Sequence, residues 1–152
     1  MAKLELEKCN SLLDNDFSLI TVKENKQPNI AWKKYQTQKP TKTEFERNWH
    51  LQTSDAVGLV TGYNKVEVID VDLKVFDSEL KRTEFWTEYL SFLNDNIENF
   101  QSKFIIVKTK NNGYHILYRC NFTQGNTKLA KLENIKEAVI ETRGIGGYVF
   151  IY

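Results

Sequence analysis

Cysteine is scarce in this chain, and its placement excludes the usual zinc sites. The two cysteines, Cys9 and Cys120, are isolated from each other in the sequence and fit no zinc-ligand spacing. Isolated cysteines of this kind are typical of proteins that stay reduced. We therefore expect a reduced protein in the cytoplasm, with neither a structural zinc nor a disulfide to explain its fold.

Long hydrophobic runs are also missing. No apolar stretch approaches the roughly 20 residues that a membrane-spanning helix needs. The first eight residues, Met-Ala-Lys-Leu-Glu-Leu-Glu-Lys, contain no apolar core of a signal peptide. Internal repeats and low-complexity tracts are absent as well. These observations predict a protein with no membrane partner.

Excess charge of either sign is lacking too. The formal net charge is +1, so nothing in the overall charge drives the chain toward nucleic acid, and any such binding must use a local patch. With 41% hydrophobic and 27% charged residues, the composition is that of a folded globular protein. At 152 residues we expect one domain, 1–152. The chain stops within the apolar run 148–152, so we also expect it to be a fragment of a longer protein.

The most informative stretch is residues 66–72, Val-Glu-Val-Ile-Asp-Val-Asp. Its β-branched residues and alternating polarity predict a strand. Alternation places Asp70 and Asp72 on the same face, beyond two valines of that face. Two carboxylates at this spacing could jointly hold divalent cations. The alternative is a strand that simply ends in a polar loop.

The remaining pattern predicts an α+β fold. Apolar residues at helical spacing between 86 and 100 indicate a long helix that packs on a sheet. Helices are also predicted at 3–14 and 42–50, and strands at 17–22, 57–62, 104–109, 114–119, 139–143 and 148–152. We expect 57–62 and 66–72 to pair as an antiparallel hairpin, and 121–137 has no clear form. A ferredoxin-like or RNA-recognition-motif-like sheet with helices on one face fits this order.

Three further features could carry chemistry. His115 follows an Asn-Gly turn, Glu141 lies on a predicted strand, and Arg143 precedes the glycine-rich segment 144–147. Each has an ordinary explanation as a structural histidine, an ion-pair partner or a plain turn. Together with the two aspartates, however, they are what nucleotidyl transfer requires: carboxylates for two cations, and donors for a triphosphate.

Here the sequence resembles a known family. The matching segments are Lys-Gln-Pro at 26–28 with Trp32, Trp49 before Val57–Gly62, Val-Ile-Asp-Val-Asp at 68–72, Thr-Lys-Asn-Asn-Gly-Tyr-His at 109–115 with Ile-Leu-Tyr after it, and Ile-Glu-Thr-Arg-Gly-Ile-Gly-Gly-Tyr-Val at 140–149. In their order and spacing they resemble the primase–polymerase domain of the archaeo-eukaryotic primase superfamily, in the version carried by plasmids, phages and integrated elements.

The resemblance implies an RNA-recognition-motif-like catalytic sheet with an N-terminal α/β unit. It implies that Asp70, Asp72 and Glu141 bind two Mg²⁺ or Mn²⁺ ions. His115 would contact the phosphates of a nucleoside triphosphate, and Arg143, Lys108 and Lys110 are further candidates for phosphate or template. The implied partners are a single-stranded DNA template, a primer and a helicase domain or protein. Asn111-Asn112 stands where the family often has Ser-Gly.

Two other functions compete with this prediction. A phosphatase of the haloacid dehalogenase type also has Asp-x-Asp after an apolar strand, but it expects Thr or Val where Lys74 stands, and a Rossmann-like alternation. A non-catalytic or decayed nucleic-acid-binding module with the same sheet would stack bases on Tyr114 and Tyr118. Acidic groups on a binding face repel phosphate unless a metal is present, which disfavours that alternative.

Overall fold

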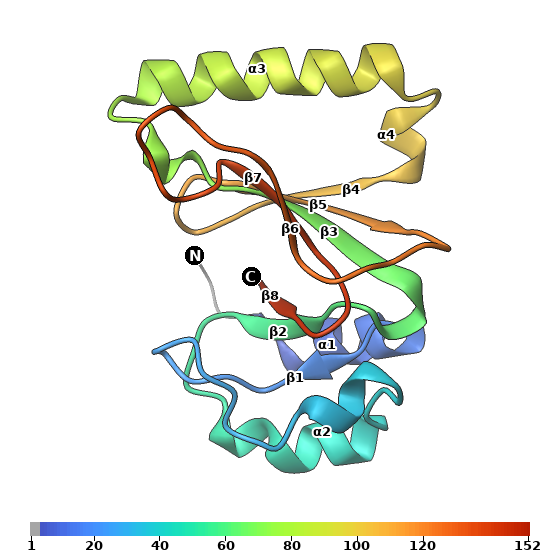
Figure 1. The fold of residues 1–152 in the computed structure, drawn as a ribbon. Coiled ribbons are helices and arrows are strands. Elements are labelled where there is room, and N and C mark those ends of the chain that lie inside the picture. The colour runs from blue at the N-terminus through green and yellow to red at the C-terminus, as the bar shows by residue number, and fades with distance from the viewer. Residues whose placement is uncertain (1–3) are drawn as a thin grey trace.

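The computed structural model describes residues 4–152, which form an α+β fold with two antiparallel sheets and several helices (Figure 1). The large sheet has the strand order β4 (Ile105–Lys108), β5 (Tyr114–Arg119), β3 (Val66–Val71), β7 (Ile140–Arg143) and β6 (Thr127–Ala130). The small sheet has the order β1 (Leu19–Ile20), β2 (Val57–Val60) and β8 (Tyr148–Ile151).

The helices are α1 (Leu6–Asp14), α2 (Lys42–Asn48), α3 (Glu79–Asn96) and α4 (Phe100–Lys103), with short 3₁₀ helices at Lys33–Gln36, Trp49–Leu51, Tyr63–Lys65 and Leu73–Val75. Hydroxyl caps define where two of them begin: Thr41 accepts from Glu44 N at the start of α2, and Ser78 accepts from Lys81 N at the start of α3. The predicted helices 3–14 and 42–50 are confirmed in substance, although residue 3 lies outside the described part.

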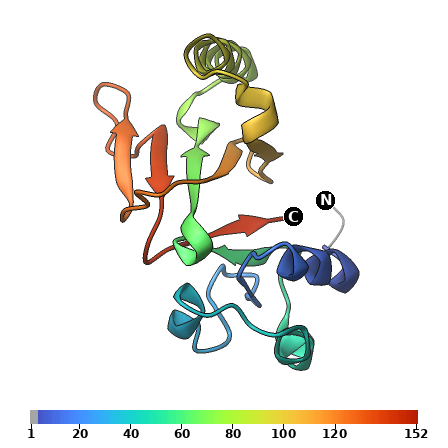
Figure 2. The same ribbon diagram turned by 90° about the vertical axis from the view of Figure 1, so that its right-hand side faces the viewer.

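The helix predicted from the stripe at 86–100 is divided in two. α3 ends at Asn96, and Asn99 adopts a left-handed conformation (φ 58°) before α4 begins. Both helices lie on the same face of the large sheet (Figures 1 and 2). The apolar stripe packs there with Leu93 and Phe100 buried and its other members partly buried, and the Trp86 ring stacks on Tyr114 of β5 with centroids 3.7 Å apart. The chain therefore crosses from β3 through α3 to β4, and β5 lies between these two strands.

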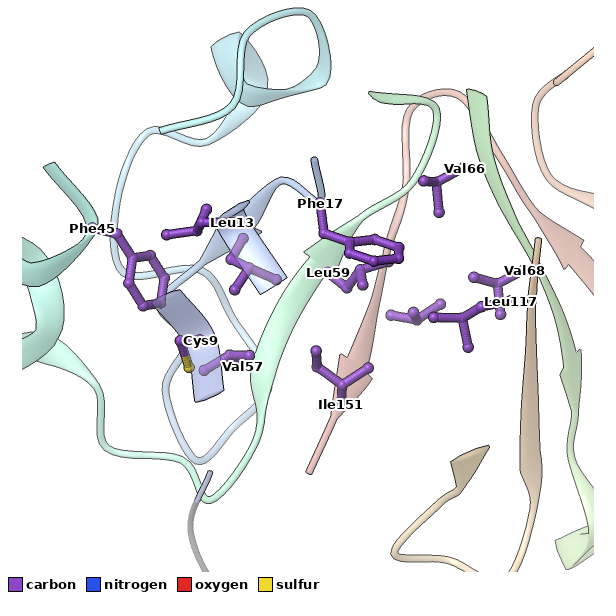
Figure 3. Close-up of a cluster of buried hydrophobic side chains, with 12 residues drawn as sticks. Cys9, Leu13, Phe17, Phe45, Val57, Leu59, Val66, Val68, Leu117 and Ile151 are labelled. Atoms are coloured by element: carbon purple, nitrogen blue, oxygen red, sulfur yellow. The ribbon is translucent and has the colours of Figure 1, made fainter. Parts of the chain in front are cut away.

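The other face of the large sheet packs in part on the small sheet. Val66, Val68 and Leu117 meet apolar side chains of the small sheet and α1 in one cluster (Figure 3). Cys9 belongs to this cluster, and burial raises the pKa of its thiol to about 11. Cys9 is therefore a core residue, and both cysteines are free thiols. Among residues 4–152, no helix has the length and apolarity to cross a membrane.

The predicted hairpin between 57–62 and 66–72 is wrong. β2 pairs with β1 and β8, whereas β3 pairs with β5 and β7 in the other sheet. The connecting residues Gly62, Asn64 and Lys65 all have positive φ, and the Gly62 N–H donates to Val66 O. These residues do form a turn, but it passes the chain from one sheet to the next. All four β2 residues are buried, so this strand needs neighbours on both of its edges and faces.

Candidate active site

Asp70 occupies the centre of a row of side chains across the large sheet. It lies opposite His115 of β5 on one side and opposite Glu141 of β7 on the other. Directly opposed residues of antiparallel strands project from the same face. β3, β5 and β7 therefore bring together three groups that are far apart in the sequence, on the face away from α3. The face predicted for Asp70 from period-2 alternation along 66–72, shared with Val66 and Val68, agrees with this arrangement.

Asp72 lies one residue beyond the end of β3. Its backbone N–H continues the ladder by donating to Val139 O, and its side chain accepts from Lys74 N at the start of the 3₁₀ turn Leu73–Val75. The Lys74 ammonium is 2.7 Å from its second carboxylate oxygen. The contacts with Lys74 thus hold the Asp72 side chain at the end of the strand, and Asp72 lines the same hollow as Asp70.

This hollow is polar and has a volume of about 220 Å³. The large sheet and its loops contribute Asp70, Asp72, His115 and Arg143, while Phe150 and Tyr152 close it from β8 and the residue that follows. A second hollow of about 350 Å³ shares Asp70, His115 and Arg143 and extends past Gly146. The cleft therefore lies between the two sheets. A larger, mainly apolar hollow at the β4–β5 edge contains none of the predicted site residues.

Arg143 and His115 contact the acidic groups of the row. Arg143 Nε is 3.5 Å from Asp70 Oδ2, and another nitrogen of the same guanidinium donates to Glu141 Oε1. His115 Nε2 is 3.5 Å from Asp70 Oδ1. Burial by itself raises the pKa of Asp70, but His115 and Arg143 together outweigh burial and hold the pKa below its ordinary value. Asp70 is consequently ionised at neutral pH.

The donor set fits a hard divalent cation in its chemistry. Carboxylate oxygens are the ligands that Mg²⁺ and Mn²⁺ prefer, and Asp70, Asp72 and Glu141 supply them on neighbouring strands. In the part of the chain that is described, no three His, Cys, Asp or Glu side chains converge as a ready metal site. Glu141 is held by Arg143 and does not line the 220 Å³ hollow, and Asp72 is held by Lys74.

The two candidate lysines of the hairpin separate in space. Lys110 lines the hollow, and its ammonium is 3.1 Å from Asp55 Oδ2. Lys108 lies opposite Tyr114, on the face that α3 covers, in a crevice that includes Trp86. The structure therefore brings Lys110 to the cleft with Asp70 and His115, and it leaves Lys108 on the other side of the sheet.

Comparison with known protein families adds to this geometry. Residues 10–152 match the family described as Prim-Pol, bifunctional DNA primase/polymerase, N-terminal. The chain belongs to the Prim-Pol family. This family is one of DNA primase/polymerase enzymes, so membership implies nucleotidyltransferase chemistry with DNA and nucleotides as substrates. Among curated proteins, no significant match to the sequence was found.

The glycine-rich loop of this Prim-Pol domain combines a packed and an open end. A Cβ built on Gly144 would lie 1.8 Å from the Gln124 carbonyl oxygen, so only glycine fits there. Gly146 has φ +90° and open space beside it, and Gly146 and Gly147 line the second hollow. The packed end at Gly144 fixes the position of the preceding Arg143. The open end at Gly146 leaves its backbone accessible from the second hollow.

Sequence reasoning missed the residues that the Prim-Pol domain contributes from outside the large sheet. Lys26, Phe150 and Tyr152 all line the cleft. Lys26 entered the resemblance only as part of a motif, and its segment shows no local chemical signal. Alternation along β8 could have placed Phe150 and Tyr152 on one face, but not beside the aspartates, because the pairing of β8 with β2 is a long-range contact.

Proposed function

We propose that this chain is the catalytic domain of a primase–polymerase of the archaeo-eukaryotic primase superfamily, in the type carried by plasmids, phages and integrated elements. It would transfer ribo- or deoxyribonucleotides from triphosphates to a 3′-hydroxyl on a single-stranded DNA template. The observation that carries the proposal is the row His115–Asp70–Glu141 across three strands, with Asp72 on the same hollow. The family match supports it independently.

In this function Asp70, Asp72 and Glu141 are the residues that would hold two Mg²⁺ or Mn²⁺ ions. Such ions, when bound, lower the pKa of the attacking 3′-hydroxyl and offset charge on the leaving pyrophosphate. The low pKa of Asp70 supports its role, because the carboxylate is already deprotonated at neutral pH.

His115 and Arg143 would bind the phosphates of the incoming nucleotide, and Lys110 would assist from the hairpin turn. Arg143 suits this role because its planar guanidinium donates several hydrogen bonds in one direction. It now spans Asp70 and Glu141, so binding a triphosphate would exchange two carboxylate partners for phosphate oxygens. Lys108 has no part in this proposal, because it lies on the face that α3 covers.

The wider setting is proposed on the resemblance. The order β4-β5-β3-β7 with α3 between β3 and β4 supports kinship with the RNA-recognition-motif sheet. The domain 1–152 would act within a longer cytoplasmic protein or alongside a helicase. Its DNA partners would be the template strand and the primer.

Primer extension tests the proposal most directly. Extension of a primer on single-stranded DNA with Mn²⁺ and deoxynucleoside triphosphates should be lost in Asp70→Ala/Asp72→Ala. The matched control is Asp77→Ala/Asp95→Ala. It also removes two carboxylates, one just before the N-cap of α3 and one within α3, and it leaves the cleft unchanged. Equal extension by the Asp70/Asp72 variant and the wild type would contradict the assignment and leave a module that only binds nucleic acid.

A further inference from the structure

Lys26 reaches the cleft from the N-terminal part of the chain. It lies in the turn between β1 and the 3₁₀ helix Lys33–Gln36, where its own φ is +65°. Two backbone hydrogen bonds of 2.9 Å, from Lys23 N to Gln27 O and from Lys26 N to Lys23 O, close this turn. The Tyr148 hydroxyl donates to the Lys26 carbonyl at 3.2 Å. The backbone of Lys26 is therefore fixed against β8.

The side chain of Lys26 faces the acidic row from the opposite wall. It lines both hollows of the cleft, each of which also contains Asp70 and Arg143. Its ammonium lies 5.5 Å from the centroid of the Phe150 ring, a distance typical of a cation–π contact. Phe150, which lines both hollows, thus supports the lysine, and Lys26 remains exposed to solvent.

The other lysines and arginines of the smaller hollow are already paired. Arg143 contacts Asp70 and Glu141, Lys74 contacts Asp72, and Lys110 contacts Asp55. Within residues 4–152, Lys26 makes no ion pair. A lysine that is fixed at its backbone, supported by a ring and free of a carboxylate is available to an anionic ligand.

We propose that Lys26 binds the phosphate groups of the incoming nucleotide, across the cleft from Arg143. This assignment rests on the proposed function. A triphosphate needs several cationic partners, and those on the large sheet are bound to carboxylates until it arrives. Lys26 is the cation that can attract the phosphates first, without breaking an ion pair. The nucleotide would then connect the small sheet to the large one.

Equilibrium binding to dATP and dAMP, with Mn²⁺ present, tests the assignment. Lys26→Met should weaken dATP binding by about 10- to 100-fold, the loss of one charge-assisted hydrogen bond, and change dAMP binding much less. Lys26→Arg keeps the charge and should stay within about threefold of wild type. Lys23→Met is the matched control, because it removes an exposed lysine of the same turn that lines neither hollow.

Several outcomes would overturn the assignment. One is unchanged dATP affinity in a folded Lys26→Met protein. Another is weaker binding of a single-stranded oligonucleotide with dATP binding intact, which would assign Lys26 to the template backbone. A wild-type chain that binds no dATP would refute both this assignment and the proposed function.

One result separates this assignment from the proposed function. If Lys26→Met weakens dATP binding while Asp70→Ala/Asp72→Ala still extends primers, the phosphate role of Lys26 is supported and the proposed catalytic role of the aspartates fails.

Discussion

Arg143 and Asp70 face each other across β7 and β3, with Nε 3.5 Å from Oδ2, although Asp70 pairs in register with Glu141. The guanidinium also contacts Glu141, so one cation neutralises two of the three proposed metal ligands. Two carboxylates this close repel each other unless a cation separates them. The positive charge of Arg143 therefore neutralises these carboxylates, as the metal ions of the proposed reaction would.

Replacing Arg143 with Gln should strengthen metal binding and weaken nucleotide binding. Removal of a positive charge beside Asp70 and Glu141 should tighten Mn²⁺ binding, without nucleotide, by about 3- to 10-fold. Binding of dATP should weaken, because a phosphate donor is lost. Titration of Mn²⁺ followed by electron paramagnetic resonance measures the first effect. Arg82→Gln is the control, since Arg82 donates to the Phe76 carbonyl near α3. Weaker Mn²⁺ binding in Arg143→Gln would show that Arg143 holds Glu141 in place for the metal.

Asp70 should make folding stability sensitive to acid. Its native pKa lies below the ordinary 3.8, so ionised Asp70 contributes stability above about pH 4, and this contribution is lost as pH falls through the native pKa. The free energy of unfolding of wild type minus that of Asp70→Asn should stay constant above about pH 5 and decrease progressively as the pH falls below it. Urea unfolding across this range measures it.

The control for the acid experiment is Asp95→Asn, on the solvent side of α3. Its difference from wild type should change little across the same range. A wild-type advantage over Asp70→Asn that grew as pH fell would mean that the native pKa of Asp70 is raised. Burial would then outweigh the effects of His115 and Arg143 on the pKa of Asp70.

Local pattern predicted the strands of the site and the face of Asp70. Period-2 alternation correctly separated Asp70 from Ile69, because that periodicity is a property of any strand. The composite site depends on the pairing of Asp70 with His115 and with Glu141, which lie 45 and 71 residues further along the chain. Before the structure, only the family resemblance indicated that these residues come together. The register that sets Asp70 between His115 and Glu141 is a finding of the structure.

Long-range contacts explain what the sequence did not predict. A turn with positive φ at Gly62, Asn64 and Lys65 was compatible with a hairpin, but the turn does not determine which strand becomes the neighbour. β2 pairs with β8 instead of β3, and this pairing places Val149 and Ile151 in the buried cluster with α1 and the large sheet. The strand β6 within 121–137 was not predicted, because its residues are mostly exposed and lack alternation.

The two tyrosines of the nucleic-acid-binding alternative should prove to be structural. Tyr114 stacks on Trp86 with an interplanar angle of 6°, and the Tyr118 hydroxyl donates to Glu67, where burial raises the pKa of the phenol. Tyr114→Leu should lower the free energy of unfolding by about 1–2 kcal/mol, because an aromatic pair is lost. Binding of a single-stranded oligonucleotide should be unchanged. Phe122→Leu, at an 83% exposed position, should alter neither quantity.

Loss of oligonucleotide binding in Tyr114→Leu, with stability unchanged, would favour the alternative instead. The ring would then have to leave Trp86 to stack on a base. Urea unfolding and fluorescence anisotropy on the same protein preparations distinguish the two results.

Gly144 should be intolerant of any side chain, because its backbone is packed on both sides. The Thr61 hydroxyl donates to its carbonyl at 2.6 Å, and a Cβ would lie 1.8 Å from the Gln124 carbonyl oxygen. Gly144→Ala should therefore lower the free energy of unfolding by about 1–3 kcal/mol, the usual cost of overpacking. Gly125→Ala is the control, since its Cβ would meet nothing closer than 3.9 Å. Because Gly144 follows Arg143 directly, the backbone shift should also loosen the Arg143–Asp70 contact, and Gly144→Ala should lose part of the acid sensitivity that Asp70 confers. Equal stability of the two alanine variants in urea unfolding would mean that the 144–147 loop yields without strain.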